Sequence, residues 1–322
     1  MATSVEAWVE QVRAGEVRAL SRAVSAIENR TQDAEEIVSR IFPHTGQAYR
    51  LGITGAPGTG KSTLVDRLAA HYRATCKTVG IIAVDPSSPF TGGAILGDRI
   101  RMQGHAGDAG IFVRSMATRG YLGGLAQAAG DAALLLDAAG KQVIMIETVG
   151  VGQGEIEVVR YADCTLVVLV PGMGDDIQNL KAGLMEIADI FVLNKFDREG
   201  AQRFEQQLAA MLQIMPAREG WKPPVVHTVA TEGTGIDDLA AQVQAFRTHF
   251  DGPERRKARE MAYWKDWLLR LLRSRLTDLV ASRMNERQFD ALVAEVSARK
   301  KDPYTAVNEI LSNAGLPEDR HI

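Results

Sequence analysis

Hydrophobic residues near the N-terminus recur at three- and four-residue intervals from Val5 to Phe42. This spacing is the period of amphipathic helices, because it places the apolar side chains on one face. The pattern ends at Pro43-His44-Thr45-Gly46, where proline and glycine break a helix. It predicts a helical arm over residues 1–48, whose apolar face carries Trp8, Val9, Val12, Val17, Leu20, Val24, Ile27, Ile37, Val38 and Ile41.

The pattern changes after the arm, where short hydrophobic runs rich in β-forming residues alternate with longer helical stretches. Several of these runs are apolar throughout, as expected for strands of a parallel sheet that helices cover on both faces. The alternation predicts a doubly wound α/β domain with a mostly parallel sheet over residues 49–250. The runs are Tyr49 to Thr54, Thr78 to Val84, Gly110 to Arg114, Gln142 to Thr148, Thr165 to Val170, Ile190 to Leu193 and Val225 to Val229.

Strand-like runs stop at Asp251-Gly252-Pro253, and helical spacing takes over. The segment Glu254 to Arg283 is rich in Arg and Lys around one apolar stripe, and further helical patterns run from Gln288 to Ser297 and from Tyr304 to Leu311. We therefore expect a helical C-terminal extension over residues 251–322. Its basic residues are interleaved with acids and with Trp and Leu, which favours a surface for a partner helix over a nucleic-acid site.

Composition narrows the possible functional classes. Hydrophobic residues make up 46% and charged residues 24% of the 322 residues, as in folded globular proteins, so disorder is excluded as the main state. The net charge of −3 gives no general attraction to nucleic acid or anionic lipid. The two cysteines, Cys76 and Cys164, are far apart and predict neither a disulfide framework nor a thiolate metal site. No apolar run is long enough to span a bilayer, so we expect a cytoplasmic protein with no membrane partner.

The first predicted strand leads into Gly55-Ala56-Pro57-Gly58-Thr59-Gly60-Lys61-Ser62-Thr63, which matches the phosphate-binding pattern G-x-x-x-x-G-K-[ST]. Glycines allow backbone N–H groups to turn toward phosphates, and the following helix presents its positive N-terminus. In this pattern Lys61 binds the β- and γ-phosphates, and the hydroxyl of Ser62 binds Mg²⁺. The motif predicts a P-loop nucleotide site; the alternative is a glycine-rich turn that binds nothing.

The run Asn194-Lys195-Phe196-Asp197 follows another apolar strand and has the form of a guanine-binding motif. A carboxylate at Asp197 accepts two N–H groups from one edge of guanine, whereas adenine presents a different set of donors and acceptors. Together with the phosphate loop, the motif predicts GTP and GDP as the nucleotide ligands. The alternative is that Asp197 caps a following helix.

Acidic residues also end two predicted strands between these motifs. Asp85 and Glu147 lie at the carboxyl edge of the sheet, where ligands bind in open α/β folds. Since Mg²⁺ keeps several waters and takes few carboxylates, both acids are candidates for the metal site and for catalysis. Asp98 is a third candidate metal residue. The alternative for each acid is a place at the start of a helix.

The glycine-rich segment after Glu147 contains Gln153, a candidate for positioning the water that attacks the γ-phosphate. A flexible connector is the alternative for this segment. The six histidines form no paired spacing, so we expect no zinc or nickel site. No arginine finger or catalytic base follows from the sequence, and we therefore expect slow hydrolysis that a partner completes.

These motifs, together with the stretches DPSSPFTGGAILGDRIRM (85–102) and ETVGVGQ (147–153), resemble the methylmalonyl-CoA mutase-associated GTPases. This MeaB, ArgK and MMAA group lies within the SIMIBI class of P-loop GTPases, and the resemblance covers nearly the whole chain. It implies a homodimeric G-protein that acts as a chaperone of an adenosylcobalamin-dependent acyl-CoA mutase. Such a chaperone gates cofactor loading, protects the mutase from inactivation and hydrolyses GTP faster when the mutase is bound.

The resemblance also implies roles for individual residues. Asn194, Lys195 and Asp197 would hold guanine together with a loop formed by Val229, Ala230 and Thr231. Residues 171–183, with Asp175 and Lys181, would form an additional switch toward the mutase, and the C-terminal helices would form the dimer. By similarity, Lys61 and Ser62 would bind phosphate and Mg²⁺, and Asp85, Asp98 and Glu147 would form the magnesium and switch network. The candidate catalytic residues are therefore Lys61, Asp85 and Glu147, together with Gln153 from the glycine-rich segment.

Two departures qualify the match. Val229 replaces an expected Ser in the guanine loop, and Glu147-Thr148-Val149-Gly150 replaces the usual Asp-x-x-Gly as the family's own variant. Two other functions stay open from the sequence. One is a kinase that phosphorylates a transport-system protein, and the other is a metallochaperone GTPase.

Overall fold

The structure is a computed structural model that describes residues 4–85, 107–117, 122–148, 160–172 and 182–315. The chain divides into two compact units, Met1–Arg256 and Lys257–Ile322. All the strands and the motifs predicted to bind nucleotide belong to the first unit.

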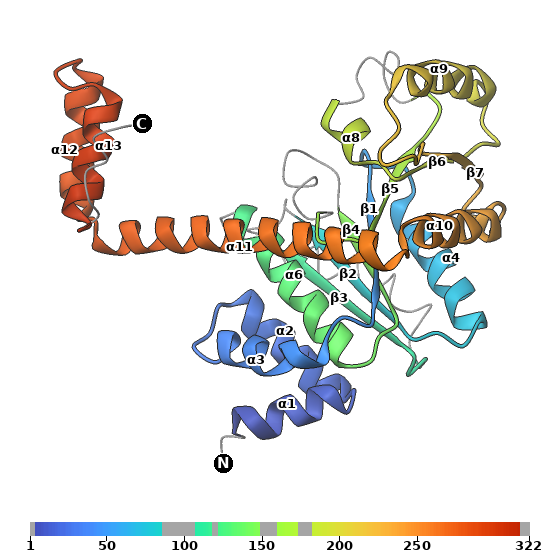
Figure 1. Ribbon diagram of the computed structural model, residues 1–322, viewed down its shortest axis with the longest axis horizontal. Coiled ribbons are helices and arrows are strands. Elements are labelled where there is room, and N and C mark those ends of the chain that lie inside the picture. The colour runs from blue at the N-terminus through green and yellow to red at the C-terminus, as the bar shows by residue number, and fades with distance from the viewer. Residues whose placement is uncertain (1–3, 86–106, 118–121, 149–159, 173–181, 316–322) are drawn as a thin grey trace. The chain divides into compact units, whose positions relative to one another are not determined.

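A seven-stranded sheet forms the centre of the first unit (Figure 1). Every strand pair is parallel, in the order β3-β2-β4-β1-β5-β6-β7. This confirms the predicted α/β class and its parallel sheet. The strands are β1 (Tyr49–Thr54), β2 (Val79–Asp85), β3 (Ile111–Ala117), β4 (Val143–Thr148), β5 (Cys164–Leu169), β6 (Ile190–Asn194) and β7 (Val225–Thr228).

The strand order places β1 at a switch point. Strands β2, β3 and β4 lie on one side of β1, whereas β5, β6 and β7 lie on the other. In open α/β sheets, ligands bind outside the carboxyl ends of the strands at such a point. The phosphate loop after β1 and the guanine motif after β6 are therefore positioned at one edge of the sheet.

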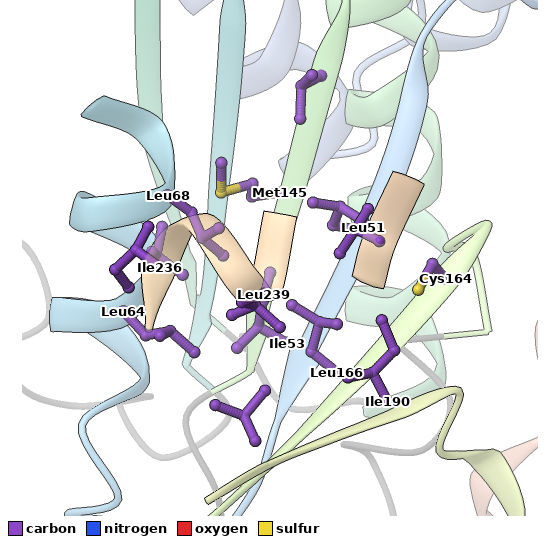
Figure 2. Packing of buried hydrophobic residues seen from close by; sticks show 14 of the residues in the cluster. Leu51, Ile53, Leu64, Leu68, Met145, Cys164, Leu166, Ile190, Ile236 and Leu239 are labelled. Carbon is purple, nitrogen blue, oxygen red and sulfur yellow. The ribbon is translucent and has the colours of Figure 1, made fainter. Parts of the chain in front are cut away.

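One face of the sheet is covered by α4 (Lys61–Ala74) and α10 (Ile236–Phe250). Alternate residues of the strands, among them Leu51, Ile53 and Leu166, pack against leucines of both helices (Figure 2). This packing requires the period of two along each strand and the three- to four-residue spacing along each helix. It fixes the direction of α4, the helix that begins at the phosphate loop.

The opposite face contacts α6 (Leu122–Ala138), α8 (Ala182–Ile187) and α9 (Ala201–Ile214). Along α6 the buried residues include many alanines, and they occupy more than one side of the helix. A helix that is apolar on most sides must be covered on most sides. The sheet covers one side of α6, and the N-terminal helices cover another.

Those N-terminal helices are α1 (Val5–Arg13), α2 (Val17–Glu28) and α3 (Ala34–Ile41), followed by a short 3₁₀ turn over Phe42–His44. Figure 1 shows them beside α6. The buried carboxylate of Asp137, on α6, accepts N–H groups from Gly46, Gln47 and Ala48 at 2.6, 3.1 and 3.0 Å. It thereby fixes the chain between the arm and β1, inside the same compact unit.

The second unit contains most of α11 (Pro253–Arg283), with α12 (Glu286–Ser297) and α13 (Pro303–Asn313). Asp302 caps α13 by accepting the N–H groups of Tyr304 and Thr305, each at 3.0 Å. The Lys301 ammonium pairs with Glu295 of α12 and Glu309 of α13 at 2.9 and 2.5 Å. Among the described residues no helix combines the length and apolar character that crossing a membrane requires.

Candidate functional site

The phosphate loop connects β1 to α4 through glycines in left-handed conformations. Gly55 has φ 142° and Gly60 has φ 89°. A Cβ atom on Gly55 would lie 2.2 Å from the carbonyl oxygen of Val168, in β5, and one on Gly60 would lie 2.5 Å from Nδ2 of Asn194. The sequence therefore needs glycine at both positions for space as well as for backbone freedom. Between them Ala56, Pro57 and Gly58 are exposed, whereas Thr59 is buried.

Lys61 is the first residue of α4, and its side chain is buried. Its ammonium donates to the carbonyl oxygens of Gly55 and Ala56 at 2.6 and 3.0 Å. The side chain thus folds back along the loop, and the positive charge is held where the loop turns. A fixed positive charge at the N-terminus of a helix attracts phosphate.

Ser62 and Glu147 lie together although 85 residues separate them in the chain. The Ser62 hydroxyl donates to Oε1 of Glu147, which is buried near the end of β4. This bond places the Glu147 carboxylate beside the first turn of α4. Beside it, the Thr148 hydroxyl bonds the Thr54 hydroxyl at 3.1 Å, linking the ends of β4 and β1.

The remaining predicted metal and catalytic residues are only partly described. Asp85 is the last residue of β2, two strands from β1, so its backbone lies at the same edge of the sheet. Asp98 and Gln153 lie outside the described residues, as does most of the predicted switch, including Asp175 and Lys181. No group of three or more acids, His or Cys gathers at a metal-binding distance in the described part of the chain.

Asn194 joins the guanine motif to the phosphate loop. Its side-chain amide donates to the carbonyl oxygen of Thr59 at 2.8 Å. Its Oδ1 accepts from the Thr228 hydroxyl at 3.0 Å and from the N–H group of Ala230 at 3.1 Å. Lys195, at φ 55°, adds a bond from its ammonium to the carbonyl oxygen of Gly58 at 2.8 Å. The two motifs recognised separately in the sequence therefore form one connected site.

Asp197 is exposed just beyond β6. The next helix, α9, has Gly200 as its N-cap and no side-chain capping bond, so Asp197 does not cap it. Its neighbour Phe196 stacks on His227 of β7, with ring centroids 3.8 Å apart and planes 5° from parallel. The stacked pair supports the turn that carries Asp197 at the surface.

The base loop, defined here as Val229–Thr231, follows β7. Val229 forms an isolated bridge with Thr234, in which its N–H group donates at 3.1 Å. Ala230 is buried and bonded to Asn194, whereas Thr231 is exposed. The departure at Val229 leaves this backbone arrangement intact, because its bonds come from the main chain.

Sequence reasoning did not single out Arg67, on α4. Its guanidinium donates to the carbonyl oxygens of Ala230 and Thr231 at 3.0 and 2.6 Å. It lies six residues after Lys61, outside any motif. Only the packing of α4 beside the base loop reveals it.

Comparisons with known proteins show the family to which this chain belongs. The sequence pattern of the family described as "Methylmalonyl Co-A mutase-associated GTPase MeaB" matches residues 20–285. The chain belongs to this family of GTPases. It therefore binds guanine nucleotides and hydrolyses GTP.

Individual relatives cover most of the chain. A Pyrococcus abyssi protein is 47% identical over 95% of this chain and 96% of its own length. GTPase ArgK of Escherichia coli is 34% identical over 94% of each chain. A crystal structure of a protein named "LAO/AO transport system kinase" is 27% identical, covers 97% of this chain and 98% of its own, and has a TM-score of 0.75. These matches confirm the predicted family and its P-loop fold.

The crowding at Gly60 gives a test of the connected site. Gly60→Ala should weaken GDP binding at least about tenfold, because the new Cβ displaces the Asn194 amide in addition to straining the backbone by roughly 1–2 kcal/mol. Gly140→Ala is the matched control: Gly140 has φ 77°, and its Cβ would meet nothing within 4 Å. Titration calorimetry with GDP checks both. Equal affinities of the two variants would contradict the assigned role of Gly60.

Proposed function

We propose that this GTPase is Mg²⁺-dependent and serves as a G-protein chaperone of an adenosylcobalamin-dependent acyl-CoA mutase. The single observation that supports its nucleotide site best is Asn194, which bonds both the phosphate loop and the base loop. A molecule held by both must have a phosphate at one end and a base at the other. Asp197 and the base loop then select guanine.

The chemistry at the phosphate end follows from Lys61, Ser62 and Glu147. The Lys61 ammonium is already fixed in the loop, so it stabilises charge on the β- and γ-phosphates with little reorganisation. Asp85 and Gln153 are proposed to complete the site by holding the metal's water shell and by orienting the attacking water. Hydrolysis then depends on placing that water in line with the bond that breaks.

A hard cation fits the oxygen donors present. The Ser62 hydroxyl and the Glu147 carboxylate supply oxygen ligands without any nitrogen or sulfur, which is the donor chemistry that Mg²⁺ prefers. Asp98 is proposed as a further member of this group. When bound, Mg²⁺ neutralises negative charge that develops on the phosphates. The small number of protein ligands suits an ion that keeps several waters.

The mutase partner is inferred from the family. The family description names methylmalonyl-CoA mutase, and the mouse relative named "Methylmalonic aciduria type A homolog, mitochondrial" is 32% identical over 71% of this chain and 56% of its own length. We propose that GTP hydrolysis gates cofactor loading and protects the mutase, with residues 171–183 as the switch that contacts it. A cytoplasmic location is part of the same proposal.

Replacing Asp197, the acid proposed to bind the guanine base, tests selectivity for guanine. Asp197→Asn replaces an acceptor with a donor, so the variant should lose GTP affinity by about tenfold or more and gain affinity for xanthosine triphosphate. Asp238→Asn, at another exposed acid near the start of α10, is the control and should leave both affinities unchanged. Competition against a fluorescent nucleotide measures them. Unchanged GTP affinity of Asp197→Asn would remove the guanine argument.

The partner is tested by hydrolysis with and without an adenosylcobalamin-dependent acyl-CoA mutase. Release of phosphate should be slow alone, rise at least several-fold with the mutase, and stop when EDTA removes Mg²⁺. Equal rates with and without each of several such mutases would argue against partner activation. Labelled phosphate transferred to a transport-system protein would instead favour the kinase activity for which the related crystal structure is named.

Homodimer formation is proposed through the C-terminal helices. Met261, Leu268 and Leu272 of α11 are 65%, 63% and 53% exposed, and Leu276 and Leu279 continue the same stripe. A repeated exposed stripe along a helix is suited to a second copy of the same helix.

Leu272→Glu should therefore shift the chain from dimer to monomer, because it places a charge within the apolar stripe. Thr277→Glu is the control, since this exposed position lies about 140° around the helix from Leu272. Sedimentation velocity distinguishes the two states. A wild-type monomer, or a Leu272→Glu dimer as stable as wild type, would count against this interface.

A further inference from the structure

Arg67 links the helix that starts at the phosphate loop to the loop that holds the base. It lies in the second turn of α4, with its Nε 3.0 Å from the carbonyl oxygen of Ala230 and its Nη2 2.6 Å from that of Thr231. Two donors of one planar guanidinium thus bind two successive carbonyl groups. A lysine ammonium lacks this fork, so the geometry is specific to arginine.

The base loop is held from two directions as a result. The N–H group of Ala230 is bonded to Asn194, whereas its carbonyl group is bonded to Arg67 and, at 3.3 Å, to the N–H group of Gly233. With both polar groups of Ala230 engaged, the peptide planes on either side of it have little freedom to rotate. The orientation of the Thr231 carbonyl is fixed by the same guanidinium.

A second side chain on the same face of α4, one turn after Arg67, contacts α10. Nδ1 of His71 lies 2.8 Å from Oδ1 of Asp237, in the first turn of α10. Positions 67 and 71 are four residues apart and therefore lie on one face of the helix. The base loop and the start of α10 are consequently both attached to α4.

We propose that Arg67 is a positioning residue for the guanine base, acting through the carbonyl groups of Ala230 and Thr231. It sets the conformation of the base loop by anchoring two of its carbonyl groups to α4. This inference rests on the proposed nucleotide site. It adds a residue outside the sequence motifs that determines how tightly the base, as opposed to the phosphates, is bound.

The test separates base binding from phosphate binding in the full chain. Arg67→Ala should weaken GDP affinity about tenfold and raise the GDP dissociation rate by a similar factor, while the affinity for inorganic tripolyphosphate, which lacks a base, stays within about twofold of wild type. Arg67→Lys keeps the charge and loses the fork, so it should restore only part of the GDP affinity. Displacement of a fluorescent guanine nucleotide reports all of these values.

Arg73→Ala is the matched control on the same helix. Arg67 makes two hydrogen bonds through its guanidinium. Arg73 makes three, two to Asp108 and one to the carbonyl oxygen of Lys77, and none of these reaches the base loop. It should leave GDP affinity unchanged. An equal loss of GDP affinity in Arg67→Ala and Arg73→Ala would show a general effect on α4 and overturn the proposal.

Two further outcomes distinguish this inference from the proposed function. Wild-type chain that binds no GDP would refute the nucleotide site itself. Wild-type chain that binds GDP, with an Arg67→Ala variant that binds it equally well or loses tripolyphosphate to the same extent, would refute only the role of Arg67.

Discussion

The amide side chain of Asn194 is the interaction on which the site depends. It is buried at the end of β6 and uses its donor on the phosphate loop and its acceptor on the base loop. A buried amide left with unmade bonds costs about 1–3 kcal/mol, so each loop is held in the conformation that satisfies it. One rigid amide group, attached to a fully buried strand, therefore sets the distance between the phosphate loop and the base loop.

The sheet makes that arrangement possible. β1 and β6 are separated only by β5, and all three are parallel, so the segments after β1 and β6 emerge at the same edge. The leucines and valines between the sheet and α4 fix the direction in which the helix dipole points. Hydrophobic packing thus fixes the direction of α4, and the polar groups at the edge of the sheet are proposed to contact the nucleotide.

Much of this could be predicted from the sequence, because the parts concerned have local signals. The buried strands are continuous apolar runs, and the glycines, Lys61 and Asn194 occur in motifs with fixed spacing. Arg67 could not be predicted, since its role depends on a contact across 163 residues of chain. The sequence predicts that Ser62 and Glu147 belong to one site. It does not predict the hydrogen bond between them, because residue spacing does not show which donor bonds which acceptor.

The alanine-rich character of α6 has a consequence for how the N-terminal arm should be regarded. Small side chains let α2 and α3 approach α6 closely, and Asp137 ties down the chain that enters β1. The arm supplies no described residue to the nucleotide site, but it covers the helix that packs on the sheet carrying that site. Removing the arm would expose one side of α6, the helix that covers this face of the sheet, to water. The shortest part of the chain that can fold and act by itself is therefore longer than the segment that contains the catalytic motifs.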